Sequence, residues 1–310
     1  MSHVVALVHL TSNDALGAFL ANKRSPATRS AYAADLKSFA RYLGVEAAAS
    51  EHTILAANVG QVIGWRDSMI SSGAAPATVA RRLSSLRTFY RFAKSIGAVS
   101  VNVAELVEGP RVDSARQRAP HLEARQARKL LSTPDTKTVR GLRDRAILGL
   151  LASSGLRRAE VAGVRLADVT SATAGISVMV DGKGGRVRTV DVDRATADAI
   201  VAYLAAQGRM LGSEHGPLFR PLRNPRGQGN LDKHLTLRAI NAIVAGYAIS
   251  GDIAAEGGAV APHALRRTFA TVAIDRGASL ETLRRTMGHA DLRTTARYDR
   301  RRQSTLTVTY

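Results

Sequence analysis

The chain has 310 residues, 45% of them hydrophobic, and no cysteine, which excludes disulfides and thiolate metal sites. No apolar run reaches the roughly 18 to 20 residues that a membrane span needs, and the start lacks the basic leader and cleavage site of a signal peptide. A net charge of +19 indicates a polyanionic partner, most often nucleic acid. We therefore predict a cytoplasmic protein without membrane attachment.

The positive charge is unevenly distributed along the chain. Residues 116–310 carry 32 of the 44 basic side chains. Arginine accounts for 37 of these bases, and a GC-rich genome also encodes arginine freely. A single arginine is therefore weak evidence for a DNA contact, whereas the excess in the second part of the chain is informative.

The first hundred residues show the apolar spacing of helices. Pro26 stands just inside the start of one segment, where proline is favoured, and Tyr32, Leu36 and Phe39 follow at helical spacing. Helices are predicted over residues 14–22, 26–43, 59–71 and 76–96.

Four basic residues lie off the apolar stripe of the helix over 76–96. They are Arg81, Arg87, Arg91 and Lys94. Each one alone fits a solvated helix face. As a group on a basic protein, we predict that they contact a DNA backbone.

A stretch rich in proline, glycine and mixed charge, residues 105–121, interrupts the helical pattern. We place a domain boundary there. The predicted organisation is an N-terminal helical domain over 1–108, a linker over 109–121 and a C-terminal domain over 122–310.

The C-terminal domain begins with helical patterns and then changes period. Helices are predicted over residues 122–131, 139–153, 194–207 and 233–248. Arg157 and Glu160 lie three apart on a short helical segment, close enough to interact. Alternation around Asp181-Gly182 predicts a β-hairpin with Lys183 at its glycine-lined tip. Lys183 alone fits an ordinary loop, and Arg186 beside it is a predicted DNA contact.

The last fifty residues hold four chemically active side chains in fixed order. They are His263, Arg266, His289 and Tyr298. Arginine forks bind phosphate oxygens, histidine moves protons near neutral pH, and a phenol can attack phosphorus once its charge is stabilised. Each residue alone has an ordinary structural explanation, but together they indicate chemistry on a phosphodiester.

Five segments in this order resemble the tyrosine recombinase (phage integrase) family, in particular its Xer-like site-specific recombinases. They are SGLRRAE (154–160), DGKGG (181–185), HALRRTFAT (263–271), MGH (287–289) and TTARY (294–298). The resemblance implies a mainly α fold. It consists of a helical N-terminal core DNA-binding domain and a mixed α+β catalytic domain with a small β-hairpin or sheet.

The resemblance also implies which residues stabilise the phosphate. Arg157 and Arg266 would hold the non-bridging oxygens, His289 would donate a further hydrogen bond, and Glu160 would orient Arg157. Negative charge builds up on these oxygens during attack, and cationic hydrogen-bond donors stabilise it. Side chains already supply the cations, so no metal is expected.

The nucleophile and the proton carriers follow from the same resemblance. Tyr298 would attack phosphorus to give a 3′-phosphotyrosyl link, His263 would help take its proton, and Lys183 would protonate the leaving 5′ oxygen. One phosphodiester is exchanged for another of similar energy, so no ATP or other cofactor is needed.

The predicted function is site-specific DNA recombination, in dimer resolution or in integration and excision of a mobile element. The expected partners are double-stranded recombination sites and copies of the chain, as a tetramer on DNA, or a related recombinase. Two alternatives remain: a DNA-binding accessory protein of the same fold without strand exchange, and a type IB topoisomerase-like enzyme that relaxes one duplex.

Overall fold

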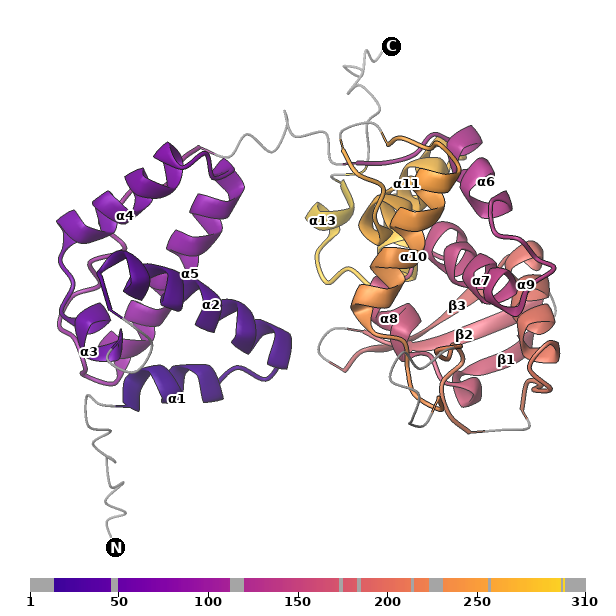
Figure 1. Cartoon of the computed structure of the whole chain (residues 1–310), viewed down its shortest axis with the longest axis horizontal. Coiled ribbons are helices and arrows are strands. Elements are labelled where there is room, and N and C mark those ends of the chain that lie inside the picture. The colour runs from indigo at the N-terminus through magenta and orange to yellow at the C-terminus, as the bar shows by residue number, and fades with distance from the viewer. Residues whose placement is uncertain are drawn as a thin grey trace, which may run out of the picture. The chain divides into compact units, whose positions relative to one another are not determined.

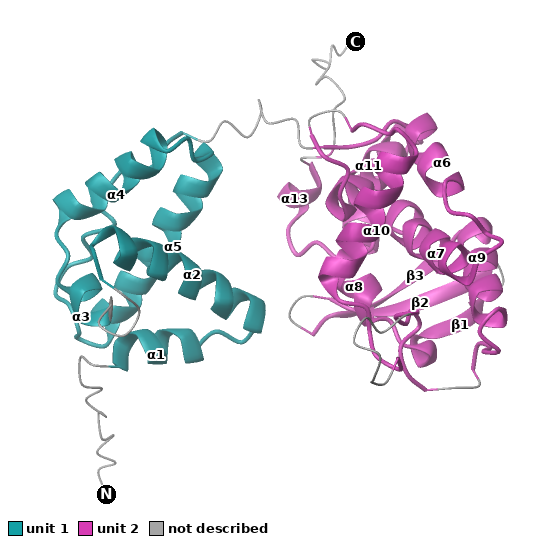
Figure 2. Ribbon diagram, viewed as in Figure 1, with its two compact units in different colours: residues 1–114 teal, residues 115–310 magenta. Residues whose placement is uncertain are grey.

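The structure is a computed structural model of the whole chain, and it divides into two compact units, Met1–Ser114 and Ala115–Tyr310 (Figures 1 and 2). It describes residues 14–45, 50–111, 120–172, 175–182, 185–212, 215–222, 231–255, 258–296 and 298. The boundaries predicted for the domains and the linker remain a proposal.

The N-terminal unit is built from helices. They are α1 (Ala15–Ala21), α2 (Pro26–Tyr42), α3 (Ser50–Leu55), α4 (Val59–Ser71) and α5 (Pro76–Ser95). Asn58 caps α4, because its side chain accepts from the Gln61 amide at 3.0 Å while the Gln61 side chain accepts from the Asn58 amide at 2.9 Å. The fully buried rings of Phe19 and Phe89 meet at 5.4 Å between centroids and join α1 to α5.

Buried and half-buried polar contacts tie α5 to its neighbours. The carboxylate of Asp35, 3% exposed, accepts from Arg81 and from the Ser85 hydroxyl at 2.7 Å, which joins α2 to α5. Arg87 donates to the Ala104 carbonyl at 3.1 Å and so holds the segment that follows α5. Buried carboxylates require such partners, so these contacts position the helices.

The C-terminal unit mixes helices with one small sheet. Its elements are α6 (Ala124–Ser132), α7 (Val139–Ser153), α8 (Arg158–Gly163), the 3₁₀ turn η2 (Leu166–Asp168), β1 (Val169–Ala172), β2 (Gly175–Asp181), β3 (Val187–Val192), α9 (Arg194–Ala205), α10 (Leu237–Ser250), α11 (Pro262–Asp275), α12 (Leu280–Met287) and α13 (Leu292–Ala296). Helix α7 is central and packs against α6, α8, α9, α10 and α11.

The close packing of α7 has a local cause in the sequence. Gly149 lies where a Cβ atom would come within 2.6 Å of the Thr196 hydroxyl on α9. A glycine there lets the two helices approach closely. Ile147, Leu148 and Leu151 on α7 are fully buried in the core of this unit.

The strands form an antiparallel sheet in the order β1-β2-β3 (Figure 1). The predicted hairpin is present as β2 and β3, with Val178 opposite Val190. Strand β1 was not predicted, because only Val169 of its four residues is buried and no apolar alternation marks it. The predicted fold class is confirmed: a mainly helical chain, with a helical N-terminal domain and a mixed domain that holds a small sheet.

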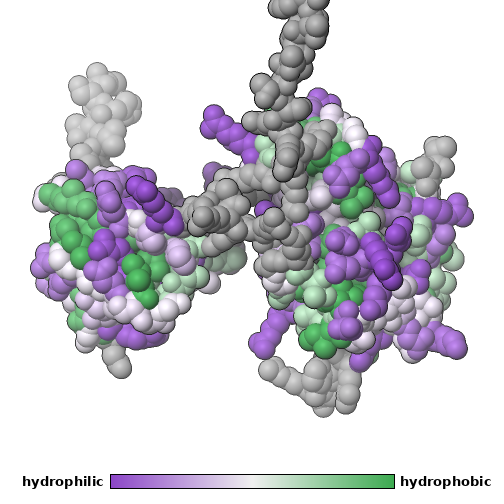
Figure 3. Space-filling view, turned by 90° about the horizontal axis from the view of Figure 1, so that it is seen from above, coloured by the Kyte–Doolittle hydropathy of each residue, from purple (hydrophilic) through white to green (hydrophobic). Residues whose placement is uncertain are grey.

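The surface of both units mixes residue types. On the face drawn in Figure 3, hydrophilic side chains divide the apolar ones into small patches. Within the described ranges, no helix combines the length and the apolar character needed to cross a membrane. The same ranges contain no group of three or more His, Cys, Asp or Glu residues arranged to hold a metal ion.

Candidate active site

Five of the predicted catalytic residues line one pocket of about 570 Å³ in the C-terminal unit. They are Arg157, His263, Arg266, His289 and Tyr298. Arg157 precedes α8, His263 and Arg266 belong to α11, and His289 and Tyr298 follow α12 and α13. The fold therefore brings together side chains that are up to 141 positions apart in the sequence.

Arg266 is the most deeply buried of these groups, at 3% exposed. Its guanidinium donates to the Gly155 carbonyl and, at 2.6 Å, to the Met287 carbonyl at the end of α12. A helix C-terminus carries partial negative charge, which favours a cation there. Burial, followed by repulsion from Arg157, lowers the pKa of Arg266 to about 10, so it stays charged at neutral pH.

Arg157 is held on one side and open on the other. It donates to Glu160 at 2.8 Å and to the Gly288 carbonyl at 2.8 Å, and one third of its side chain stays exposed. The predicted contact between Arg157 and Glu160 is thus present. Its open edge borders the pocket, where an anion can approach it.

Glu160 has a second partner that the sequence did not reveal. Its side chain is only 4% exposed, and Arg188 on β3 grips both of its oxygens at 3.0 and 2.9 Å. Burial alone would raise the pKa of Glu160, but the hydrogen bonds from Arg188 and Arg157 outweigh burial and hold it below its usual range. Glu160 is therefore an ionised carboxylate shared by two arginines.

His289 lies between Arg266 and Thr295. Its Nε2 atom is 3.0 Å from Nη2 of Arg266, and its Nδ1 atom is 2.9 Å from the Thr295 hydroxyl. Arginine can only donate, so Nε2 accepts and the ring proton lies on Nδ1. Burial, together with the charges of Arg266, Arg157 and Arg188, lowers the pKa of His289 to about 4. In this state Nε2 is an acceptor, so the implied donor role requires Arg266 to turn from His289 to a phosphate and the ring proton to move from Nδ1 to Nε2.

Tyr298 is docked into its own chain's pocket. Its ring stacks on His289 with centroids 5.9 Å apart and planes 16° apart, and Arg267 lies 5.5 Å from the ring centroid. The residue is 8% exposed and packs with Ile274, Leu283 and other residues of α11 and α12. These contacts hold the Tyr298 ring in the pocket that Arg157 and Arg266 also line.

His263 stands at the open start of α11. The residue is exposed at the surface. Partial burial of its imidazole and repulsion from Arg267, Arg266 and Arg157 lower its pKa below the ordinary value. A neutral imidazole at pH 7 can accept a proton, which suits the base implied by the resemblance.

The other predicted site residues, which are Lys183 and the predicted DNA contacts, fall into three groups. Lys183 lies outside the described residues. Arg186 and Lys94 are exposed. Arg81 and Arg91 are more than half exposed but pair with Asp35 and Glu105, and Arg87 donates to backbone carbonyls. Part of their donor capacity thus serves the N-terminal unit, and their DNA contacts remain a prediction.

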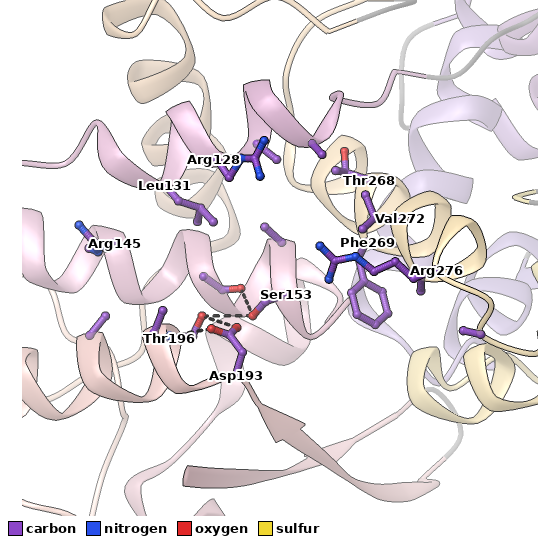
Figure 4. Close-up of a pocket in the computed structure, with 18 of the residues that line it drawn as sticks. Arg128, Leu131, Arg145, Ser153, Asp193, Thr196, Thr268, Phe269, Val272 and Arg276 are labelled. Carbon is purple, nitrogen blue, oxygen red and sulfur yellow. Dashed lines mark hydrogen bonds between the residues drawn. The ribbon is translucent and has the colours of Figure 1, made fainter. Parts of the chain in front are cut away.

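A second cavity, of about 840 Å³, lies between α6, α7, α9 and α11 and is mostly apolar (Figure 4). Ser153, Asp193 and Thr196 form a hydrogen-bonded group on one side of it, and Phe269 and Val272 project from α11. It shares no lining residue with the pocket that holds Arg157 and Tyr298. The larger cavity is therefore not where the predicted chemistry is assembled.

Two protein families match the sequence of this chain. The phage integrase family matches residues 120–304, and the phage integrase N-terminal SAM-like domain matches residues 17–97. The chain belongs to the phage integrase family. It is therefore a tyrosine recombinase, an enzyme that cleaves and rejoins DNA.

Sequence relatives extend over most of this recombinase. It is 36% identical over 281 residues to the tyrosine recombinase XerC of Pelobacter propionicus, which covers 88% of this chain and 84% of the relative. It is 34% identical over 279 residues to XerC of Myxococcus xanthus, with 88% and 87% covered. These matches confirm the predicted family and its Xer-like character.

Solved structures show the same fold. The recombinase is similar to the XerH site-specific recombinase bound to a palindromic difH substrate, in a post-cleavage complex. The TM-score is 0.69 at 18% identity, and the match covers 93% of this chain and 80% of the other. Sequence reasoning located the pocket residues through their motif spacing, but it missed Arg188 and Thr295, which only the fold brings to Glu160 and His289.

Proposed function

We propose that Tyr298 is the nucleophile of this recombinase and that it cuts one DNA strand at a time. The phenol oxygen bonds to phosphorus while the bond from phosphorus to the 5′ oxygen breaks. The products are a 3′-phosphotyrosyl link and a free 5′ hydroxyl. The observation that carries this proposal is the placement of the Tyr298 ring in a pocket bordered by Arg157 and Arg266.

The pocket charge suits the phosphate during this step. A phosphodiester carries one negative charge, and attack by a phenolate concentrates a second on the oxygens around phosphorus. Arg157 and Arg266 present guanidinium donors to these oxygens, and a water-poor pocket strengthens the attraction. His289 joins them as a donor once Arg266 has turned toward the phosphate and the ring proton has moved to Nε2, with Nδ1 then accepting from the Thr295 hydroxyl.

Two residues carry the protons in the proposed step. His263 takes the proton from the Tyr298 phenol, because its lowered pKa leaves it neutral and able to accept at pH 7. Lys183 gives a proton to the departing 5′ oxygen, which is a poor leaving group when unprotonated. The reverse attack by a 5′ hydroxyl from a second duplex rejoins the strands.

The proposed substrates are double-stranded recombination sites, and the proposed assembly is four copies of the chain, or of the chain and a related recombinase, on two sites. Solved structures of the same fold include a lambda integrase tetramer bound to a Holliday junction and the XerH recombinase bound to its difH substrate. We infer action on DNA in the cytoplasm, in dimer resolution or in integration and excision of a mobile element.

A trapping experiment tests the proposal. The protein selects its site from a library of random duplexes, and the site is then rebuilt as a suicide duplex with a nick beside the scissile phosphate. Wild-type protein should form a covalent adduct, Tyr298→Phe should form none, and Tyr310→Phe, which changes the nearest other phenol in the sequence, should react normally. An adduct with Tyr298→Phe would refute the nucleophile.

A second assay tests strand exchange itself. Two duplexes of different length that carry the selected site are mixed with the protein, in parallel with a supercoiled plasmid that carries one site. Recombinant products support the proposal. Relaxation without recombinants indicates a topoisomerase-like reaction, and binding without either product indicates an accessory role.

A further inference from the structure

Arg188 on β3 is a largely buried arginine that pairs with Glu160, the carboxylate beside Arg157, without lining the active-site pocket. Its side chain is 13% exposed. It is absent from the lining of the pocket that holds Arg157, Arg266 and Tyr298. A charge buried this deeply needs dedicated partners, and those partners connect Arg188 to the candidate catalytic residues.

All three nitrogens of the Arg188 guanidinium are hydrogen-bonded. Nη1 and Nη2 donate to the two oxygens of Glu160 at 3.0 and 2.9 Å, and Nε donates to the Thr286 carbonyl at 2.8 Å. The paired contact with a carboxylate is the strongest geometry that an arginine makes. Arg188 thus fixes Glu160 and the last turn of α12 relative to the sheet.

Glu160 transmits this constraint to Arg157. It accepts from the Arg157 backbone amide at 2.7 Å and from Nη1 of the same residue at 2.8 Å. Arg157 in turn donates to the Gly288 carbonyl at 2.8 Å, two residues after the Thr286 carbonyl that Arg188 holds. Both arginines therefore grip the same carboxylate and the same helix end.

The backbone at Gly288 is adapted to this arrangement. Its φ of 64° lies in the left-handed region that glycine adopts without strain. A Cβ atom there would lie 2.8 Å from Nη1 and 2.9 Å from Cζ of Arg188. Gly288 thus allows Arg188 to pass directly beneath the turn that leads to His289.

We propose that Arg188 is a positioning residue for DNA cleavage, which neutralises Glu160 so that Arg157 keeps its charge and its free edge for the scissile phosphate. Without Arg188, the Glu160 carboxylate keeps only its contacts with Arg157. The carboxylate then attracts the Arg157 guanidinium more strongly and competes with the phosphate for its hydrogen bonds. This inference rests on the proposed function, in which Arg157 binds the non-bridging oxygens.

A competing role for Arg188 would act through the hairpin. Arg188 lies five residues after Lys183, so its contacts also anchor β3, which follows the hairpin tip. If this were its main role, the loss of Arg188 would impair protonation of the leaving 5′ oxygen. The two roles predict different responses to changes in the substrate.

The test compares three duplexes that carry the site selected by this protein. The first has the ordinary scissile phosphodiester. The second has a methylphosphonate at the scissile position, which lacks the negative charge that Arg157 stabilises. The third has sulfur in place of the 5′ bridging oxygen, which leaves as a thiolate without needing a proton. Adduct formation is measured for wild type, Arg157→Ala, Arg188→Met and Arg188→Lys, with exposed Arg194→Met as the charge-matched control.

We expect Arg188→Met to slow cleavage of the phosphodiester by about 10- to 100-fold, somewhat less than the loss of a direct donor, with unchanged binding of the duplex. The methylphosphonate should return Arg188→Met and Arg157→Ala to within a few-fold of wild type, and the sulfur substrate should not. Arg188→Lys, which keeps the charge but not the fork, should fall between Arg188→Met and wild type. The Arg188→Lys variant also allows the test to be made if Arg188→Met does not fold.

Three results would overturn the inference. A deficit corrected by sulfur as well as or better than by methylphosphonate would assign Arg188 to the hairpin, and a deficit that neither substrate corrects would assign it to stability alone. Normal cleavage by Arg188→Met would also refute it. If the wild-type protein forms no adduct at Tyr298, the proposed function itself fails. If the wild-type protein forms the adduct and one of the three results above is found, only the inference about Arg188 fails.

Discussion

Asp35 in the N-terminal unit and Glu160 in the C-terminal unit are both buried carboxylates, and they differ in the charge that surrounds them. Asp35 pairs with Arg81 and, at 4.0 Å, with Arg82, whose side chains are 53% and 32% exposed, and it accepts from the Ser85 hydroxyl. Glu160 faces two arginines, with the buried Arg266 close by. The first group joins two helices through arginines that reach solvent, whereas the second adds a third, deeply buried arginine and so carries the larger excess of positive charge.

The surplus charge distinguishes a candidate site from a structural contact. Three guanidinium groups, those of Arg157, Arg188 and Arg266, share one described carboxylate. Burial, followed by repulsion from the neighbouring arginines, lowers the pKa of Arg266 and of both histidines. Leaving this repulsion uncompensated costs stability, and a bound phosphate relieves it. A cluster of three guanidinium groups that includes the buried Arg266 therefore indicates an anionic ligand, whereas the more exposed arginines around Asp35 indicate a structural contact.

The comparison predicts its largest effect at Arg266. Arg266→Lys keeps a charge but loses the fork, so we expect adduct formation to slow by about 10²- to 10³-fold. The control is Arg276→Lys at the exposed end of the same helix, which should react like wild type. The rate of adduct formation on the suicide duplex measures both. Equal rates for the two variants would show that the buried surplus charge is dispensable.

His289 makes the stability of the folded chain depend on pH. Its pKa is about 4 in the folded chain against an ordinary value of 6.5, so the unfolded chain binds the proton more tightly. Its contribution to stability is complete above pH 6.5 and is lost as the pH falls toward 4, by up to about 3 kcal/mol.

The measurement is the free energy of unfolding in urea, followed by circular dichroism between pH 7 and 4.5. His289→Gln removes this titration and should show a smaller loss over that range than wild type. If both proteins lose stability equally, His289 is not a buried neutral group.

The group around Asp35 in the N-terminal unit should affect stability and not chemistry. Asp35→Ala removes the partner of Arg81 and Ser85, which we expect to cost about 1 to 3 kcal/mol. Trp65 is the chain's single tryptophan and lies in this unit, so its fluorescence in urea reports the loss there. Asp67→Ala breaks a pair whose carboxylate is exposed, so it should cost clearly less stability than Asp35→Ala. Contradiction would come from an Asp35→Ala protein that is as stable as the Asp67→Ala protein.

The smallest predicted effect concerns Thr295, which is fully buried and bonds Nδ1 of His289. Thr295→Val keeps the shape and removes the acceptor, a change of about 1 kcal/mol, or roughly fivefold in the rate of adduct formation. Ring ¹⁵N chemical shifts of His289 should report an Nδ1–H tautomer in wild type and a mixture in the variant. An Nε2–H tautomer in the free wild-type protein would contradict the arrangement described above.

The sequence predicted the pocket residues better than their supports, for a physical reason. His263, Arg266, His289 and Tyr298 lie close together in the sequence at spacings that a short run of helices preserves. Arg188 is one of many arginines, and nothing in its local pattern shows that β3 carries it to Glu160. Strand β1 was missed for another reason: its partner β2 is the next strand in the chain, but only one of the four residues of β1 is buried, so no apolar alternation marks it.

The most direct test of the account identifies the residue that becomes joined to DNA. The adduct trapped on the suicide duplex is digested with a protease and a nuclease, and the modified peptide is sequenced by mass spectrometry. The account predicts a nucleotide attached through its 3′ phosphate to Tyr298. Attachment to any other residue, or through a 5′ phosphate, would contradict it.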